Sequence, residues 1–295
     1  MNIVVSADKK YIEPLKVLLY SIYSQNKNVN TYFINFSVAE SDLAELKLLT
    51  SKFTSCSFNN IMVPGSIKRM ITGTPTAKTG INILKKMRLS IETFSRVISL
   101  AILPETLDRA LYLDVDTIVK GDLSSFYNRD FEGKAVIGMN IYKDMKYETE
   151  YKEFLQSSFN AGVALFNLKK IREEKLVSAK NICDLINSTF ESKNFCFDEY
   201  VLNTIFKNNI LFEDYLKYNL PAEPKYLNKD IMTNKQKYIN DALIIHYIHA
   251  IKPWGAKSVL NREFCEVWKS YAKQLAETYS DITVKELTHG SNRRK

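Results

Sequence analysis

Hydrophobic and polar positions along the first half of the chain form short blocks that predict strands and helices in turn. β-Branched runs at 3–7, 31–37 and 57–63 have the composition of strands. Between them, residues 11–23 repeat leucine and isoleucine at helical spacing, and Ser41 stands as a helix cap before a second leucine-rich segment. This strand–helix rhythm predicts an α/β fold with a mostly parallel central sheet flanked by helices.

Similar patterns continue through the second half of the chain. We predict further strands at 110–113, 135–138 and 162–167, note a second apolar run at 117–119, and predict helices at 175–187, 199–206 and 263–279. Polar and helix-breaking residues interrupt the rhythm at 65–87, which we interpret as a mobile surface loop, with a basic lid over a phosphate-bearing ligand as the functional alternative. Without repeats or linkers, we expect one domain at 1–260 and a helical extension with a basic tail at 261–295.

Composition narrows the class of protein. The 295 residues are 45% hydrophobic and 25% charged, as in an ordinary globular protein, and no apolar run approaches the ~18 residues of a membrane span. The formal net charge of +8 favours an acidic partner, but the dispersed Lys and Arg residues do not indicate nucleic acid. The N-terminus lacks a secretory leader pattern, so we expect a cytoplasmic protein.

Two carboxylates at the end of a predicted strand are the main candidate for chemistry. Asp114 and Asp116 follow the apolar run 110–113, and alternate side chains of a strand face the same side. Oxygen ligands of this kind suit Mg²⁺ or Mn²⁺, and ligands of parallel sheets bind at the carboxyl ends of the strands. His246 would complete a mixed oxygen and nitrogen set that suits Mn²⁺. Lys252 is either a solvated charge or a contact to a diphosphate at the same metal.

The ordered set of motifs resembles glycosyltransferase family 8, which includes glycogenin and bacterial lipopolysaccharide galactosyl- and glucosyltransferases. The resemblance covers most of residues 1–254 and rests on Ile3–Asp8 with Tyr11, Leu89–Arg96, Leu111–Asp116, Phe159–Leu168, Asp198–Asn203, and His246 with Lys252–Trp254. It implies the single-domain GT-A fold, the nucleotide-diphospho-sugar transferase type, and retaining transfer of a hexose from a UDP-sugar. The cofactor implied is Mn²⁺, with Mg²⁺ as an alternative, and the acceptor is a glycan or glycolipid.

The resemblance also assigns roles to individual residues. The metal ligands would be Asp114, Asp116 and His246, and the nucleotide would contact Ala7, Asp8, Tyr11, Arg96 and Val115. The donor sugar would contact Asn160, Ala161, Gly162, Asp198 and Glu199, while Lys252 would stabilise the leaving diphosphate and act in catalysis with Asp198 and Glu199.

Departures from the family pattern leave alternatives open. Glu199 stands where Gln is common, so it is either a nucleophile or a group that positions the sugar and stabilises charge; we favour front-side departure without a covalent intermediate. Asn140 replaces an Asp of the galactosyltransferases and His249 replaces a usual Gly. These two changes motivate the alternative of a catalytically weak, UDP-sugar-binding scaffold in a glycan-assembly complex.

The C-terminal segment offers a contact with anionic membrane. Phe264, Trp268, Tyr271 and Leu275 share one face of the predicted helix, and the chain ends in a basic tail, 293–295. Such a helix would either lie peripherally at the inner face of the plasma membrane or pack its aromatic face on the protein's own core.

Overall fold

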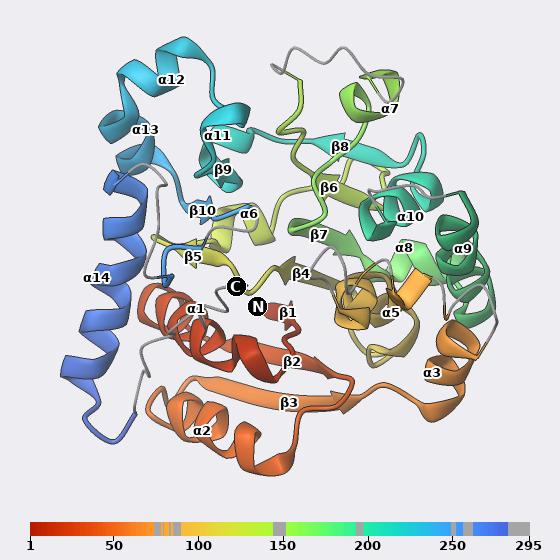
Figure 1. The fold of residues 1–295 in the computed structure, drawn as a ribbon, viewed down its shortest axis with the longest axis horizontal. Helices are drawn as coiled ribbons and strands as arrows, with labels where there is room; N and C mark the ends of the chain where they lie inside the picture. The colour runs from red at the N-terminus through yellow and green to blue at the C-terminus, as the bar shows by residue number, and fades with distance from the viewer. Residues whose placement is uncertain are drawn as a thin grey trace, which may run out of the picture.

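The computed structural model describes residues 1–73, 78, 80–82, 84, 90–143, 152–192, 197–248, 252–255 and 262–282 (Figure 1). Ten described strands form two sheets: β1 (Asn2–Val5), β2 (Val29–Asn35), β3 (Cys56–Met62), β4 (Arg109–Leu113), β5 (Thr117–Val119), β6 (Val136–Gly138), β7 (Val163–Asn167), β8 (Ile210–Phe212), β9 (Leu220–Pro221) and β10 (Ile244–His246). The predicted α/β class with a mostly parallel sheet is confirmed.

The large sheet has the strand order β3-β2-β1-β4-β7-β6-β8. β3, β2, β1 and β4 are mutually parallel, while β7 runs antiparallel to both of its neighbours. The small sheet, β5-β10-β9, begins where the chain leaves β4 and turns into β5. The carboxyl ends of β1 and β4 therefore open beside the small sheet.

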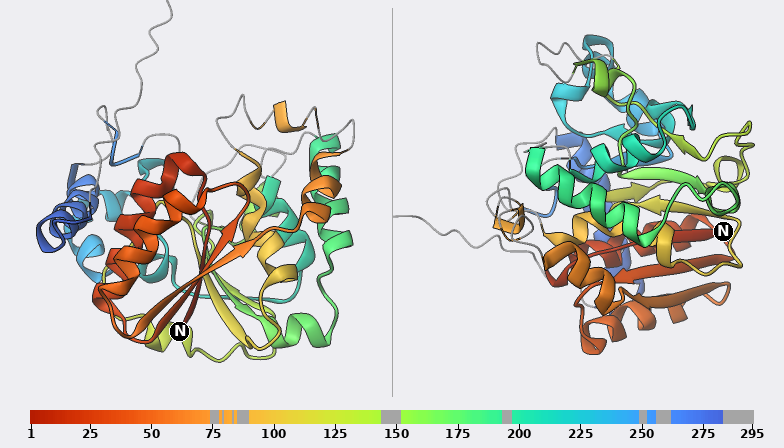
Figure 2. Two further views of the ribbon diagram at one scale, coloured as in Figure 1. Left: turned by 90° about the horizontal axis from the view of Figure 1, so that it is seen from below. Right: turned by 90° about the vertical axis from the view of Figure 1, so that its right-hand side faces the viewer.

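Helices cover both faces of the large sheet (Figure 2). The described helices of at least four residues are α1 (Ile12–Gln25), α2 (Glu40–Ser51), α3 (Gly65–Thr72), α5 (Ser95–Ile102), α6 (Ser124–Tyr127), α7 (Lys152–Gln156), α8 (Leu168–Glu173), α9 (Ala179–Ser192), α10 (Phe197–Ile205), α11 (Tyr215–Tyr218), α12 (Lys229–Thr233), α13 (Lys235–Asp241) and α14 (Arg262–Thr278), with the 3-10 turn η2 (Ile91–Phe94). Two shorter 3-10 turns are η1 (Lys9–Tyr11) and η3 (Pro224–Tyr226).

The central strands divide the core into two parts. Side chains alternate along β4, so that Leu111 and Leu113 pack with α1, α2 and the small sheet, while Ala110 and Tyr112 pack with α3, α5, α9 and α10. All four side chains are buried. The strand that leads to the two aspartates is thus fixed from both sides.

Two local predictions are wrong, and a third falls mostly outside the described residues. Ser41 does not cap α2, because the helix already begins at Glu40 after Ala39, with Glu40 and Asp42 in its first turn. The segment predicted as a loop contains α3, which forms because Ile67 and Ile71, one helical turn apart, are both buried. Most of 74–89, the candidate lid, lies outside the described residues.

The helix predicted at 175–187 begins later, as α9. Lys175 has a φ of +52° and ends α8, since a left-handed residue cannot continue a right-handed helix. Ser178 and Asn181 then exchange hydrogen bonds, the Ser178 N–H with Asn181 Oδ1 at 2.7 Å and the Asn181 N–H with Ser178 Oγ at 3.1 Å. This reciprocal pair sets the start of α9 at Ala179.

The aromatic face of α14 is turned into the protein. Phe264, Trp268 and Leu275 are buried, and the helix packs along α1 (Figure 1), where the rings of Tyr271 and Tyr20 lie 6.5 Å apart. The protein's own core therefore covers most of this face, with Tyr271 partly buried, and the predicted tail at 293–295 lies outside the described residues. No helix in the described part of the chain has both the length and the apolar character needed to cross a membrane.

Candidate metal centre and substrate site

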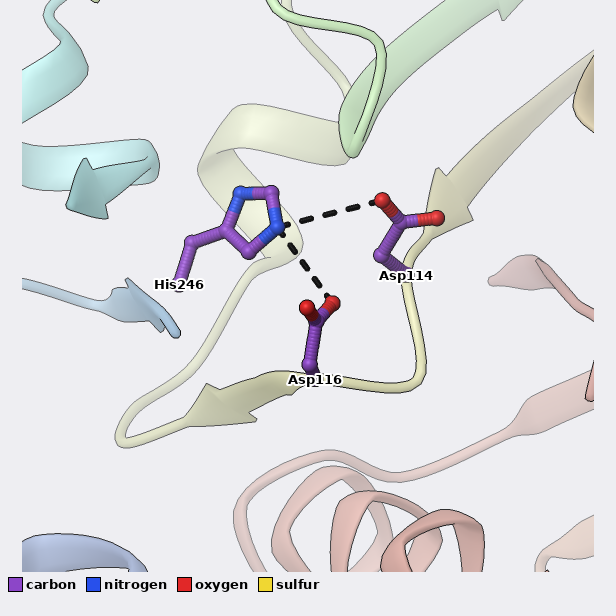
Figure 3. A group of neighbouring side chains, drawn as sticks. All are labelled: Asp114, Asp116 and His246. Atoms are coloured by element: carbon purple, nitrogen blue, oxygen red, sulfur yellow. Dashed lines mark ion pairs between the residues drawn. The ribbon is translucent and has the colours of Figure 1, made fainter. Parts of the chain in front are cut away.

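The predicted metal ligands come together at the carboxyl edge of the sheet (Figure 3). Nε2 of His246 lies 3.8 Å from Oδ2 of Asp114 and 3.3 Å from Oδ1 of Asp116. One ligand atom from each residue falls within 4.8 Å of the others. Two carboxylate oxygens and one imidazole nitrogen match the donor set of Mn²⁺ or Mg²⁺, and this chemistry fits the implied cofactor.

The two carboxylates converge through a turn and not through strand alternation, which corrects the reasoning from sequence. The Thr117 N–H and hydroxyl both donate to the Asp114 carbonyl, at 3.1 and 2.7 Å, and so close the turn between β4 and β5. The Tyr247 N–H donates to the Asp116 carbonyl at 2.8 Å. That bond fixes the turn against β10, the strand that carries His246.

Gly162, just before β7, completes the wall of the centre. Its carbonyl accepts the Asp114 N–H at 2.8 Å. A Cβ atom at this position would lie 2.2 Å from Cε1 of His246 and 2.7 Å from Oδ2 of Asp114. A side chain would displace two of the three predicted ligands, so the close approach requires glycine.

Two cations with little exposed surface, Arg96 and Lys252, balance the carboxylates. The Arg96 guanidinium lies 2.6 Å from Oδ1 of Asp114 and 3.0 Å from Oδ2 of Asp198, and Lys252 forms an ion pair with Asp116. Burial raises the pKa of Asp114 in spite of Arg96. Burial also acts to raise the pKa of Asp116, but Lys252 and then His246 outweigh it and hold that pKa well below its usual range.

Glu199, near the start of α10, contacts the Asn160–Ala161 segment that precedes Gly162. Its Oε2 accepts three hydrogen bonds: from the Tyr142 hydroxyl at 2.8 Å, from Nδ2 of Asn160 at 3.1 Å and from the Ala161 N–H at 3.2 Å. Burial raises the pKa of Glu199 to about 7; the bond from Tyr142 opposes this effect, and the charge of Asp198 adds to it. The carboxyl group therefore changes charge close to neutral pH.

The predicted nucleotide-contacting residues line the end of β1 and the turn after β4. Asp8 and Ala7 follow β1, and one Asp8 oxygen already accepts the Lys10 N–H at 2.7 Å. The ring of Tyr11 meets Trp254 edge-on at 6.0 Å. Burial first, and then the charges of Asp116 and Asp8, raise the pKa of Tyr11, so its hydroxyl lies in the field of both carboxylates. Val115, between Asp114 and Asp116, is partly buried.

The remaining residues singled out from the sequence are Asp198, Asn140 and His249. Asp198 accepts from the Thr93 hydroxyl at 3.2 Å in addition to its pair with Arg96. Asn140 hydrogen-bonds to the backbone at 155, 156 and 142. His249 lies outside the described residues.

Sequence reasoning missed Tyr142 and Asn219, two buried polar residues of the site. Tyr142 donates to Glu199, and Oδ1 of Asn219 lies 2.9 Å from Nδ1 of His246. Both stand in irregular segments where no hydrophobic period applies. The available signal was a polar residue next to apolar neighbours. That signal does not indicate which distant residue is the hydrogen-bond partner.

Comparison with known proteins assigns the fold and the family. The sequence profile described as Glycosyl transferase family 8 matches residues 2–258. The chain is 25% identical to glycosyltransferase GlyF of Streptococcus pneumoniae serotype 4 over 99% of its own length and 67% of GlyF. It is 30% identical to the lipopolysaccharide 1,2-glucosyltransferase of Escherichia coli K12 over 55% of this chain and 48% of that enzyme. The chain thus spans about two thirds and about half of these relatives.

Solved structures show the same GT-A architecture. An active-site mutant of LgtC aligns with a TM-score of 0.69 and 21% identity, over 93% of this chain and 96% of LgtC. The galactosyltransferase LgtC in complex with donor and acceptor sugar analogues aligns with a TM-score of 0.67 and 19% identity, over 96% of this chain and all of LgtC. The predicted fold is confirmed by these alignments.

Proposed function

The chain belongs to glycosyltransferase family 8, and from this premise we propose that it transfers a hexose, glucose or galactose, from a UDP-sugar to an acceptor hydroxyl with retention of configuration. The observation that carries the proposal is the cluster of Asp114, Asp116 and His246 at the carboxyl edge of the sheet. Lys252, buried beside Asp116, adds a fixed positive charge.

The proposed chemistry is electrostatic stabilisation of the leaving diphosphate. A divalent ion, Mn²⁺ or alternatively Mg²⁺, would be held by Asp114, Asp116 and His246 and would act as a Lewis acid on the diphosphate. Lys252 would offset the negative charge that grows on the β-phosphate as its bond to the sugar breaks. Two of the three proposed ligands are carboxylates, whose oxygens suit these hard ions.

The sugar would lie between Asp198, Glu199 and the Asn160–Gly162 segment. The Nε atom of Arg96 is buried without a hydrogen-bond partner among the described residues, which supports a donor oxygen as its partner. Asp198, held by Arg96, would accept from sugar hydroxyls. We favour front-side departure, in which Glu199 positions the sugar or stabilises positive charge on its ring.

The uridine would contact Ala7, Asp8, Tyr11 and Val115. Tyr11 would present its aromatic ring to the uracil, and the edge-on contact with Trp254 helps to fix the position of that ring. Asp8 would accept hydrogen bonds from the uracil or the ribose with its second carboxylate oxygen. Arg96 would serve both the phosphate and the sugar end of the donor.

For the acceptor we propose a bacterial surface glycan or a lipopolysaccharide-type glycolipid, because one relative is named as a lipopolysaccharide glucosyltransferase. A cytoplasmic enzyme that meets its acceptor at the inner face of the plasma membrane is consistent with this assignment. We further propose that residues 1–260 form the catalytic domain, with 261–295 as its helical extension and tail.

One observation favours the scaffold alternative. The Asn140 side chain donates to the carbonyl groups of Leu155 and Gln156 and accepts the Tyr142 N–H, so its amide is engaged by backbone where it could otherwise meet a substrate. A protein of this kind would bind UDP-sugar with little transfer.

A donor screen separates the two functions. The purified chain is incubated with Mn²⁺ and with UDP-glucose, UDP-galactose or their N-acetyl forms, and released UDP is measured. A transferase should release UDP slowly from one hexose donor, and Asp116→Ala should remove this release. Binding of UDP-sugar without UDP release would favour the scaffold, and failure to bind any of the four would contradict both.

A further inference from the structure

A continuous chain of hydrogen bonds connects His246 to the backbone of the Asn160–Gly162 segment. Nδ1 of His246 lies 2.9 Å from Oδ1 of Asn219. Nδ2 of Asn219 donates to Oδ1 of Asn160 at 3.1 Å, and Nδ2 of Asn160 donates to Glu199 at 3.1 Å. Asn219 is fully buried between α11 and β9, and Asn160 is nearly so.

Two backbone N–H groups determine the direction of every bond in this chain. A backbone N–H can only donate, and the Gly162 N–H points at the Asn160 side chain at 3.2 Å, so the atom that it meets must be Oδ1. Nδ2 of Asn160 then faces Oε2 of Glu199, which the Ala161 N–H independently requires to be an acceptor. The orientation of the Asn160 amide is therefore fixed by the main chain.

The orientation passes from Asn160 to the histidine. Because Oδ1 of Asn160 accepts, the Asn219 atom that faces it must be the donor Nδ2, and Oδ1 of Asn219 is left to face His246. An amide oxygen only accepts, so Nδ1 of His246 must carry a proton. In the neutral imidazole, the lone pair then lies on Nε2, the atom that faces Asp114 and Asp116.

We propose that Asn219 is a positioning residue for His246: it holds the proton on Nδ1 and keeps the Nε2 lone pair directed at the two aspartates, with its own orientation set by Asn160 and the 161–162 backbone. Without this bond the ring could rotate or place its proton on Nε2, where the proton would block a cation. The inference rests on the proposed metal site for its consequence, but the proton on Nδ1 is measurable without metal or donor.

The test uses selective ¹⁵N-histidine labelling of the metal-free protein at pH 8. The chain has three histidines, and the His246→Gln spectrum assigns the signals of His246, the one whose Nδ1 faces Asn219. Three variants are compared with the wild type: Asn219→Leu removes both polar atoms at similar volume, Asn219→Asp keeps an acceptor for Nδ1–H, and Asn26→Leu removes another buried amide. Asn26 bridges the Ile22 carbonyl and the Leu123 N–H away from the site.

We expect Nδ1 of His246 to carry a proton in the wild type, in Asn219→Asp and in Asn26→Leu, and to lose this preference in Asn219→Leu. The dissociation constant for Mn²⁺, read from the electron paramagnetic resonance of free Mn²⁺, should rise about 10- to 100-fold in Asn219→Leu. Asn26→Leu should retain the wild-type Mn²⁺ affinity even if its melting temperature falls, which separates positioning from general stability.

Two results would overturn the inference: an unprotonated Nδ1 of His246 in the wild type, or wild-type tautomer and Mn²⁺ affinity in Asn219→Leu. If Asn219→Leu does not fold, a loss of the Nδ1 proton in Asn219→Asp also contradicts it. Failure of the wild type to bind Mn²⁺, with the proton found on Nδ1, would refute the proposed metal site and leave the positioning role of Asn219 supported.

Discussion

Glu199→Gln changes the charge behaviour of a buried group with little change in shape. The wild-type carboxylate accepts three hydrogen bonds at a single oxygen, Oε2. The carbonyl oxygen of Gln can accept the same three bonds, so Tyr142, Asn160 and the Ala161 N–H keep their partner. The substitution therefore removes the ionisation of the group and preserves its local contacts.

The effect on stability follows from the pKa of Glu199, which burial raises from 4.5 to about 7. Between these two pH values the unfolded chain has released the proton while the folded protein still holds it. Stability of the wild type therefore falls as the pH rises through this window, and the deficit is fully present above pH 7. At ~1.4 kcal/mol for each pH unit, the difference between about 7 and 4.5 corresponds to a loss of about 3 kcal/mol.

Glu199→Gln should not show this pH-dependent loss of stability. Relative to the wild type, its free energy of unfolding should increase by up to about 3 kcal/mol between pH 5 and pH 8. Urea unfolding of the metal-free proteins at several pH values measures the difference. Glu173→Gln is the matched control, because its side chain is 63% exposed and should show no such trend. A pH-independent difference for Glu199→Gln would refute the reasoning.

The same variant tests the mechanism. With front-side departure, Glu199→Gln should retain measurable transfer and yield the α-linked product. If the carboxylate stabilises positive charge on the sugar, loss of ~1.4–4 kcal/mol corresponds to a ten- to thousandfold fall in rate. A nucleophilic Glu199 would lose many orders of magnitude, since an amide cannot replace it. A sugar adduct trapped on Glu199, with neighbouring Asp198 checked alongside, would overturn the front-side assignment.

The other predictions concern the metal centre and the C-terminus. Asp116→Ala should abolish Mn²⁺-dependent activity while circular dichroism shows an intact fold; near-normal turnover would contradict the ligand assignment. Gly162→Ala should weaken Mn²⁺ binding by at least about tenfold because its Cβ would collide with His246, whereas Gly65→Ala, with 3.4 Å to its nearest neighbour, should not. Removal of metal with EDTA should weaken UDP binding by at least about tenfold, measured by calorimetry, because bare carboxylates would then face the diphosphate; unchanged affinity would count against the proposed metal role. If the basic tail contacts membrane, the full chain should sediment with anionic liposomes more than a chain that ends at Thr288; equal sedimentation would contradict it.

The strands and the two aspartates could be predicted from sequence because each signal is local. The β-branched runs at β1 and β2 alternate with amphipathic helices, a pattern that favours parallel strands covered by helices. A pair of carboxylates at a strand end then faces the ligand-binding edge of the sheet. The bounds of β1 and β2 differ from the prediction by two residues at most. The hairpin-like turn at Asp114 was not predicted, because it depends on hydrogen bonds from Thr117.

The rest of the site depends on contacts between distant segments. Asn219 meets His246 because β9 pairs with β10, a register that no pattern in the sequence specifies. Tyr142 reaches Glu199 across 57 positions of the chain. Neither segment is periodic, so propensity gave no indication of which polar residue would be buried or of its partner.

The balance of charge at the centre explains why a cation and an anionic donor would bind together. Asp114, Asp116 and Asp198 oppose Arg96 and Lys252, three negative charges against two positive ones, which leaves a formal charge of −1 among these five groups. An uncompensated buried charge is unfavourable. A divalent ion would change −1 to +1, and that excess would attract the diphosphate. If the proposed function is right, the metal should therefore bind first and the donor second, because the donor alone would add negative charge to a site that already carries it.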